Sequence, residues 1–416
     1  MTIAVSGELR GPSTRDGFDV VERKGIGHPD SLADIIAEEF SRRYSLLGME
    51  RFGAVPNHWV DKVALIGAGS VIDFGCYSIE KPVSAYLFGK VTRSVGDERI
   101  PIEDLFRDVV EDVLRRATRD SRILGHLRTH VENTAGVAAD HPPFFYYPGG
   151  ASDCSAAVHG GRANDTAFCS AYAPADPLDC LAIDLEHHAN GPVFGSAFPA
   201  VGADVKVMIV RAGVSVDLTL CLPAHPDLTG SHDAYREVMA AAGEHLLAFV
   251  EGHSVVRRHQ WRTRFCLNTK DHEGGAYLAP FGTSLGKGDC GLVGRGNKAN
   301  GVISANRGAG VEALAGKNPV HHTGKLYTLA ATRIADQVFA RLKVPNETVL
   351  VSRNGDPLTA PSFVGVRLSR PVGGQDRQDI TDIVEGCLSE FGRLSRWLLA
   401  TDPIERFRKP TLALEG

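Results

Sequence analysis

Long amphipathic segments alternate along this chain with shorter segments of strand-like pattern, and this alternation constrains the fold more than any other feature. In 101–117, apolar residues recur at three- and four-residue spacing, which predicts a helix with one apolar stripe. In 214–222, apolar residues occupy every second position, which predicts a strand with one face in a core. The segment 205–210 is expected to pair with that strand across a short turn.

The same two patterns recur along the rest of the chain. Helical periodicity covers about 30–47, 233–250, 325–342 and 380–399, and further strand candidates are 63–66, 83–88, 348–352 and 363–368. We therefore expect an α/β or α+β fold in which long helices cover the sheets. Two long connections rich in Gly, Asn, Asp, Ser and Pro interrupt the pattern, at 138–163 and 268–324. Connections of that length are usually functional or disordered.

Composition excludes several classes of function. The chain has 416 residues, enough for several domains, and its 45 Lys and Arg against 50 Asp and Glu give a net charge of −5. No block of like charge provides a nucleic-acid or membrane-surface footprint. The eight cysteines are scattered without a C-x-x-C pair, which favours a reducing cytoplasm. No signal-peptide or membrane-spanning pattern is present, so we expect a cytoplasmic protein with no nucleic-acid or membrane partner.

Some motifs imitate sites without meeting their requirements. In 63–75, Ile72 replaces the third glycine of a dinucleotide fingerprint and the following residues look like a strand. The segment 282–287 is one residue short of a phosphate-binding P-loop. The pairs His187-His188 and His321-His322 are predicted to be surface histidines without a zinc site, because adjacent side chains do not converge in a helix or strand.

The sequence KGIGHPDS, 24–31, has the pattern of a helix start that can bind an anion. Two glycines precede a proline near the first turn of the helix expected at about 30–47. A helix N-terminus has unpaired N–H groups and a positive dipole, which suit a phosphate chain. His28 would be a donor there and Asp30 a hard oxygen ligand for Mg²⁺. An ordinary capped helix is the alternative that the residues alone leave open.

The connection 268–324 has the composition of an anion cradle. Arg and Lys alternate with glycines, so the backbone can approach a polyphosphate while the cations neutralise it, and carboxylates can hold bridging metal ions. A solvated glycine-rich loop is the alternative. In 162–176, Asp165 precedes small and aromatic residues, as in a pocket for a base or amino group, with an Asx turn as the alternative.

Taken together, these segments resemble the archaeal-type S-adenosylmethionine synthetases (methionine adenosyltransferases). The resemblance covers nearly the whole chain and is carried by ERKGIGHPDSLAD (22–34), ANDTAFCSAYAP (163–174), VGADVKVMIVR (201–211), GTSLGKGDCGLVGRGNKANG (282–301) and GKNPVHHTGKLY (316–327). It implies a three-domain fold with internal pseudo-threefold symmetry, and a homodimer with active sites between subunits. The expected domains are 1–145, 146–267 and 268–416. These boundaries are approximate, and segments of one domain can be interleaved with another.

The resemblance also implies a reaction and its residues. The sulfur of methionine attacks C5′ of ATP and expels triphosphate, which is hydrolysed to diphosphate and phosphate; this needs positioning and charge stabilisation more than acid–base chemistry. The cofactor is Mg²⁺, with K⁺ as a further candidate. By motif match, the catalytic residues are His28, Lys206, Arg295 and Lys317, and the metal ligands are Asp30, Asp289 and Asp271. The nucleotide- or substrate-binding residues are Asp165, Gly149, Gly150, Ser152, Asp153, Lys298 and Lys325.

The chain departs from the family pattern mainly where substrate is expected. The loop 148–153 lacks the family's glutamine, Asp61-Lys62 stands where the family usually has Asp-Gln, and Cys290 replaces a second Asp. Residues 305–308 replace a more apolar segment. Two alternatives therefore stand beside methionine adenosyltransfer. One is a divergent enzyme that expels or hydrolyses triphosphate with another nucleophile or nucleotide; the other is a non-catalytic partner subunit of another synthetase.

Overall fold

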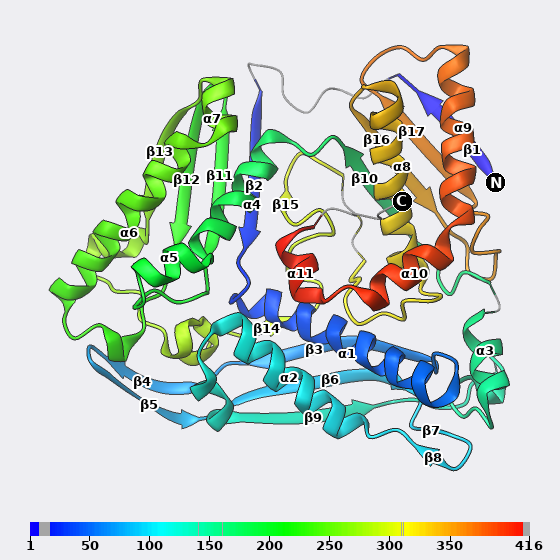
Figure 1. Cartoon of the computed structure of the whole chain (residues 1–416), viewed down its shortest axis with the longest axis horizontal. Helices are drawn as coiled ribbons and strands as arrows, with labels where there is room; N and C mark the ends of the chain where they lie inside the picture. Colours follow the sequence, from blue (N-terminus) through cyan, green and yellow to red (C-terminus); the bar gives the residue numbers. More distant parts are fainter. Residues whose placement is uncertain (8–16, 140, 160, 309, 311, 411–416) are drawn as a thin grey trace.

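The computed structural model describes residues 1–7, 17–139, 141–159, 161–308, 310 and 312–410. Within these ranges the chain forms three main sheets, each covered by two long helices (Figure 1). We call them sheet I (β14-β3-β6-β9), sheet II (β13-β12-β11-β2-β15) and sheet III (β1-β17-β16-β10). The predicted fold class, sheets covered by long helices, is confirmed. No helix of the described ranges is both long and apolar enough to cross a membrane.

The strands and helices of each sheet come from separate parts of the chain. Sheet I contains β3 (His58–Ile66), β6 (Val83–Val91), β9 (Leu127–Asn133) and β14 (Gly291–Leu292), with helices α1 (Pro29–Phe52) and α2 (Ile102–Thr118). Sheet II contains β2 (Phe18–Lys24), β11 (Lys206–Ala212), β12 (Ser215–Cys221), β13 (Arg262–Leu267) and β15 (Ile303–Ser304), with α4 (Pro177–Ala189) and α6 (His232–Gly252). Sheet III contains β1 (Thr2–Ser6), β10 (Phe168–Ala173), β16 (Asn346–Val351) and β17 (Phe363–Leu368), with α8 (Thr323–Leu342) and α9 (Gly374–Ser389).

Smaller elements connect these layers. They are the strands β4 (Gly69–Asp73), β5 (Cys76–Lys81), β7 (Ser94–Val95) and β8 (Glu98–Arg99), and the helices α3 (Ala151–His159), α5 (Pro192–Ala197), α7 (Ser254–His259), α10 (Phe391–Ala400) and α11 (Pro403–Arg408). Short 3-10 turns punctuate the long connections, among them η4 (Thr269–Glu273), η5 (Pro280–Gly282) and η6 (Ser284–Lys287). The connection 138–163 is therefore partly helical, and 268–324 is mostly irregular.

The connectivity repeats three times, as the pseudo-threefold expectation requires. The repeats are α1-β3-β6-α2-β9, α4-β11-β12-α6-β13 and α8-β16-β17-α9-β1, the last closed by the N-terminal strand. In each repeat the first two strands are antiparallel and the third is parallel to the second. The strands β2, β10 and β14 each pair antiparallel with the first strand of a sheet. Each sheet thus mixes strands from more than one expected domain, whose boundaries stay a prediction.

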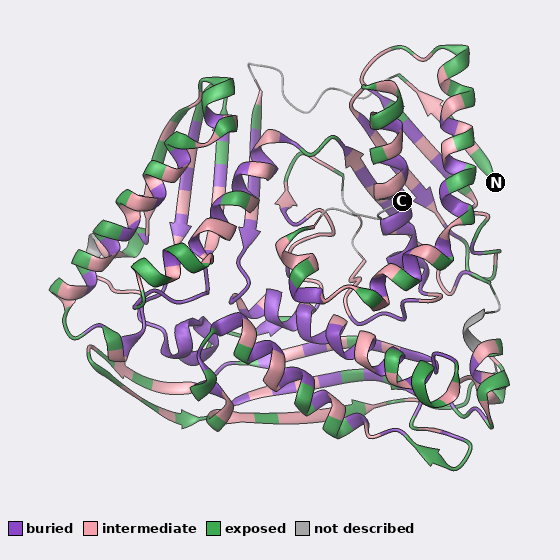
Figure 2. Cartoon of the chain, in the orientation of Figure 1, coloured by how far each residue is buried: buried purple, intermediate pink, exposed green. Residues whose placement is uncertain are grey.

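Each sheet and its helices enclose a separate hydrophobic core, visible as buried bands in Figure 2. The stripe predicted in 101–117 is buried in α2. Of the alternating residues predicted in 214–222, those from Val216 to Leu222 are buried, whereas Val214 is exposed just before β12 begins. The segment 63–75 is strand rather than a strand–helix turn, as predicted.

Two expectations were wrong. The single helix expected over 380–399 is two helices, α9 and α10, which meet at Glu390. This break lets the apolar stripes of both helices reach the same core, while the Glu390 carboxylate lies 2.6 Å from Arg333. His322 is buried rather than at the surface, because its side chain caps α8 by accepting the N–H of Lys325 at 3.3 Å.

A buried ion pair joins β2 to three other segments. Arg23 is fully buried, and its Nε donates to Oε2 of Glu186 on α4 at 2.8 Å. Its two Nη atoms donate to the carbonyl oxygens of Gly301 at 2.6 Å and Phe407 at 3.1 Å, and the Phe407 ring lies 4.7 Å from the guanidinium. One cation therefore holds the connection 268–324, at Gly301, and helix α11, at Phe407, against sheet II.

We predict that Arg23→Met lowers the free energy of unfolding by about 3–5 kcal/mol, because it leaves the Glu186 carboxylate buried without its cation. The midpoint of thermal unfolding, followed by circular dichroism, measures the effect. The matched control is Arg264→Met, which removes an exposed pair with Asp217 and should change the midpoint little. Equal midpoints for the two variants would contradict the role of Arg23.

Candidate active site

The site lies where the chain passes from β2 into α1. There it packs against the segment 203–205, which comes just before β11. The N–H of Gly25 donates to the Val205 carbonyl at 2.6 Å, and that of Gly27 donates to the Ala203 carbonyl at 3.2 Å. A Cβ on either glycine would lie within 2.6 Å of that segment's backbone, so no larger residue fits. The two glycines therefore bring the N-terminus of α1 and Lys206 to the same place.

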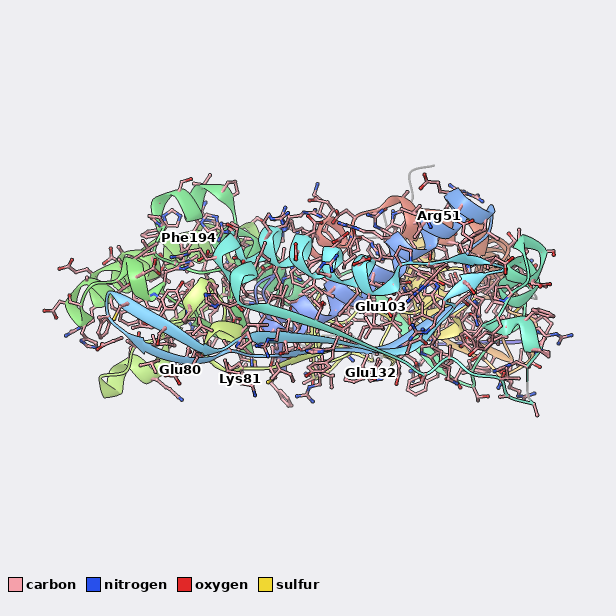
Figure 3. All side chains as sticks on the ribbon, turned by 90° about the horizontal axis from the view of Figure 1, so that it is seen from below. Arg51, Glu80, Lys81, Glu103, Glu132 and Phe194 are labelled. Carbon is pink, nitrogen blue, oxygen red and sulfur yellow. The ribbon has the colours of Figure 1, made fainter. Side chains whose placement is uncertain are left out.

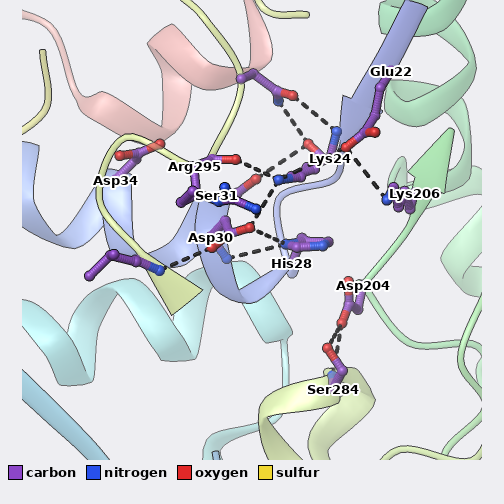
Figure 4. A network of polar contacts seen from close by, with 12 residues as sticks. Glu22, Lys24, His28, Asp30, Ser31, Asp34, Asp204, Lys206, Ser284 and Arg295 are labelled. Carbon is purple, nitrogen blue, oxygen red and sulfur yellow. Dashed lines mark hydrogen bonds and ion pairs between the residues drawn. The ribbon is translucent and has the colours of Figure 1, made fainter. Parts of the chain in front are cut away.

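His28 caps the N-terminus of α1 and also offers a hydrogen-bond donor. Its Nδ1 accepts the N–H of Asp30 at 3.2 Å, which leaves the proton of the neutral ring on Nε2. Burial lowers the pKa of His28 to about 4, against the opposing charge of Asp30, and Lys24 and Lys206 lower it further. His28 is thus a neutral hydrogen-bond donor at neutral pH. In Figure 4 its ring points away from α1, into the space below Lys206.

Four charges surround the first turn of α1 (Figure 4). Asp30 Oδ2 accepts from Lys24 Nζ at 2.9 Å, and its Oδ1 accepts the N–H of Leu292 at 3.0 Å. Lys206 Nζ lies 3.5 Å from Oε1 of Glu22. Lys24 and Lys206 face each other in the register of β2 and β11. Acidic and basic groups therefore alternate around an N-terminal helix dipole, which suits a metal-bound polyanion.

The segment 288–297 lies directly on the start of α1. A Cβ on Gly291 would lie 2.0 Å from the Pro29 carbonyl oxygen, so the two backbones touch. The Asn297 side chain binds both backbone polar groups of Lys24, at 3.0 and 2.8 Å. Asp289 and Arg295 are exposed beside the site, and in the described ranges no hydrogen bond or ion pair engages their side chains. Both are therefore available to a ligand.

Asp204 lies beneath this cluster. It is buried and accepts the N–H of Ser284 at 2.8 Å, the Ser284 hydroxyl and the Tyr277 hydroxyl at 3.4 Å. Burial raises the pKa of Asp204 to about 6, the hydrogen bonds from Ser284 lower it, and Asp289 raises it. Asp204 therefore ties the segment leading into β11 to the segment that carries Asp289.

Our sequence prediction did not include Lys24, Glu22 and Asp204 among the site residues. The signal was present, because strand alternation places Glu22 and Lys24 on one face of β2, and Asp204 lies two residues before Lys206. The predicted residues His28, Asp30 and Lys206 do lie together, and the backbone carbonyl of Arg295 accepts from Lys24.

Lys317 and Lys325 form a second cluster beside the middle of α1, at Glu38 and Ser41. Lys317 Nζ donates to the carbonyl oxygens of Val60 and Asp61, and Lys325 Nζ donates to Glu38 and to the Lys317 carbonyl. Burial lowers the pKa of Lys317 to about 8 and also lowers that of Lys325.

The two clusters are separated along α1. Ser41 binds the Lys317 carbonyl at 3.1 Å, whereas Asp30 is three helical turns earlier. At 1.5 Å per residue this is roughly 16 Å, so one chain does not bring Lys317 to His28.

The remaining predicted residues lie outside the His28 cluster. Asp165 precedes β10 and accepts the N–H of Thr166, while neighbouring Asn164 binds Thr323 at the start of α8. Asp153 accepts the N–H of Gly149 at 2.8 Å, so the segment with Gly150 and Ser152 forms the start of α3. The Asp271 carboxylate accepts from the Tyr235 hydroxyl at 2.8 Å. Lys298 and Lys325 line a cavity of about 250 Å³ together with Gly294 and Asn297.

Comparison with known proteins decides the family. The family model described as S-adenosylmethionine synthetase (AdoMet synthetase) matches residues 1–402. The chain belongs to this family. A probable S-adenosylmethionine synthase of Aquifex aeolicus is 34% identical over 365 residues, covering 86% of this chain and 87% of the relative. An S-adenosylmethionine synthase of Pyrococcus furiosus is 30% identical over 412 residues, covering 95% of this chain and 97% of the relative.

A solved structure shows the same fold. An S-adenosylmethionine synthetase of Campylobacter jejuni, described as unusual, superposes with a TM-score of 0.58 at 14% identity, over 94% of this chain and 99% of that one. The family resemblance, the fold and the enzyme class expected from the sequence are thus confirmed for this S-adenosylmethionine synthetase family member.

We predict that the His28 ring stays neutral from pH 5.5 to 8.5, since burial holds its pKa at about 4. Histidine-selective ¹⁵N NMR against pH measures this, and the signal is assigned by its loss in His28→Asn. A midpoint near the ordinary histidine value of about 6.5 would contradict the assignment of His28 as a neutral donor.

Proposed function

We propose that the protein forms S-adenosylmethionine from ATP and methionine, with release of diphosphate and phosphate. The observation that carries this proposal is the charge cluster at the first turn of α1, where His28, Asp30 and Lys206 lie together beside Arg295. Family membership supports the same reaction. Because attack by the neutral sulfur needs no acid–base pair, a neutral histidine and fixed cations are the appropriate groups for the transfer step. Water is the second reactant when the expelled triphosphate is then hydrolysed to diphosphate and phosphate.

In this mechanism the protein positions ATP and stabilises the departing triphosphate. His28 Nε2–H donates to a phosphate oxygen, and the ammonium of Lys206 and the guanidinium of Arg295 neutralise charge as the bond from C5′ to oxygen breaks. The N–H groups at the start of α1 add a positive dipole on the same side. The sulfur of methionine forms the new bond to C5′ with its own electron pair, so no proton has to be removed.

The carboxylates of the site fit Mg²⁺. Asp30 and the exposed Asp289 would supply two hard oxygen ligands. This suits Mg²⁺, which commonly combines one or two carboxylates with phosphate oxygens and water. When bound, Mg²⁺ would offset charge on the triphosphate. Asp271 as a third metal ligand and a need for K⁺ stay predictions from the resemblance.

We also propose a homodimer with active sites between subunits. Helices α1 and α2 cover one face of sheet I, and Figure 3 shows both on one side of it, with Glu132 on the other side. That other face carries stacked aromatic rings, with Tyr86 centred 5.9 Å from Phe88 and 4.5 Å from His130. We infer that a dimer across this face brings Lys317 of the partner subunit to the His28 cluster, because one chain holds the two clusters apart along α1.

A second candidate function keeps triphosphate expulsion with another nucleophile or nucleotide. It is favoured by the loop 148–153, where the Asp153 carboxylate accepts the backbone N–H of Gly149 within the same loop. The third candidate, a non-catalytic partner subunit, is opposed by the charge cluster. A cytoplasmic location stays a prediction.

The purified protein, incubated with Mg²⁺, K⁺, ATP and methionine and analysed by mass spectrometry, tests the proposal. We expect S-adenosylmethionine together with diphosphate and phosphate. Parallel reactions with other nucleoside triphosphates and thioethers test the second candidate. A different adduct, or triphosphate cleavage alone, would replace our proposal with that candidate, and no turnover with any pair would favour the third.

The shared site predicts complementation between two inactive variants. Asp30→Asn and Lys317→Ala damage different halves of the site, so each homodimer should be inactive. A heterodimer of the two contains one site with both halves intact, and a randomly exchanged mixture should recover about a quarter of the wild-type rate. The measurement is the rate of product formation after mixing, partial unfolding and reassembly. A mixture as inactive as its components would reject sites shared between subunits.

A further inference from the structure

The Lys317 ammonium is held by a bulge in β3. The pairing of β3 with β6 shifts between Val60 and Lys62, so Asp61 is an extra residue in the strand. Lys317 Nζ donates to the Val60 carbonyl at 2.8 Å and to the Asp61 carbonyl at 2.7 Å. A lysine ammonium has three donors. Two are therefore used by the bulge, and the third is the one that can bind a phosphate oxygen.

The nearest competitor for that third donor is the Asp61 carboxylate. Its Oδ1 lies 3.7 Å from Lys317 Nζ, which is longer than a hydrogen bond. The same Oδ1 accepts from Lys62 Nζ at 2.8 Å. In a regular strand neighbouring side chains point to opposite faces, and the bulge relaxes this rule, since neither Asp61 nor Lys62 is buried. Lys62 thus engages the carboxylate that would otherwise move about 1 Å and bind Lys317.

We propose that Lys62 is a positioning residue that holds the Asp61 carboxylate off Lys317, so that Lys317 keeps one N–H for the triphosphate. This inference rests on the proposed function of Lys317. Lys62 stands where the resembling family usually has glutamine, which cannot form this ion pair. The other charged groups around Lys317 are Lys325 and Glu312, and Lys325 is itself paired with Glu38. Among the described residues, Asp61 is the carboxylate within ion-pair distance of Lys317 Nζ, so its position decides how Lys317 is used.

The test is a rescue experiment. In Lys62→Ala the carboxylate is free to bind Lys317, and kcat/KM for ATP should fall about tenfold, the usual effect of one hydrogen bond to a charged group. In the double variant Asp61→Asn with Lys62→Ala the competing charge is absent, and kcat/KM should return to within about twofold of wild type. Lys62→Arg, which keeps the cation, is the conservative control and should stay close to wild type. Thermal unfolding midpoints check that all variants are folded.

Each other outcome overturns the inference. If Lys62→Ala equals wild type, Lys62 has no positioning role. If the double variant is as slow as Lys62→Ala, Lys62 acts by touching substrate directly and not through Asp61.

Isothermal titration calorimetry measures the affinity of the same variants for inorganic tripolyphosphate, which repeats the comparison without turnover. If wild type makes no S-adenosylmethionine, the proposed function fails. The tripolyphosphate affinities still decide the inference about Lys62, because the same loss and rescue must appear in them.

Discussion

The close crossing of two backbones at Gly25 and Gly27 is the constraint on which the site depends. These residues touch the segment 203–205 with no room for a side chain, and that contact joins the end of a sheet II strand to the first helix over sheet I. The helix start, Lys206 and Asp204 are positioned by this one contact. A small displacement there would move the phosphate-facing groups relative to one another, and catalysis by positioning is sensitive to displacements of that kind.

In the protein without ligands, ion pairs offset the charges that this contact brings together. The Asp30 carboxylate already has an ammonium partner in Lys24, and Lys206 has Glu22. A divalent cation must therefore share Asp30 with Lys24, and a polyphosphate must compete with Glu22 for Lys206. A metal ion and polyanion that arrive together replace both pairs at once, since each partner supplies the charge that the other displaces. The site is consequently suited to a metal–polyphosphate complex more than to either component separately.

Much of the fold and part of the site could be predicted from the sequence. The stripe of 101–117 and the alternation of 214–222 are local patterns whose period is set by one helix or strand, and both were confirmed. The helix start at His28 was predictable because glycines and proline report on the backbone directly. The break at Glu390 was not, since the pattern of 380–399 is continuous and only packing on a shared core divides it. Strand alternation places Lys24 on a face but does not say what faces it: Lys24 meets Lys206 only through the pairing of β2 with β11. Asp204 joins the site through Ser284, which lies 80 residues further along the chain. The separation of Lys317 from His28 depends on where each of them contacts α1.

The closure of sheet III by the N-terminal strand has a consequence for the order of assembly during synthesis. Strand β1 pairs with β17 in parallel, with Thr2 opposite Phe363, so β1 is synthesised long before its partner in the sheet. Sheet II likewise needs β15, and sheet I needs β14, before their edges are covered. No repeat can complete its sheet from its own residues as it emerges. The growing chain therefore carries open strand edges until late in translation, and the repeats gain their final stability together rather than one after another.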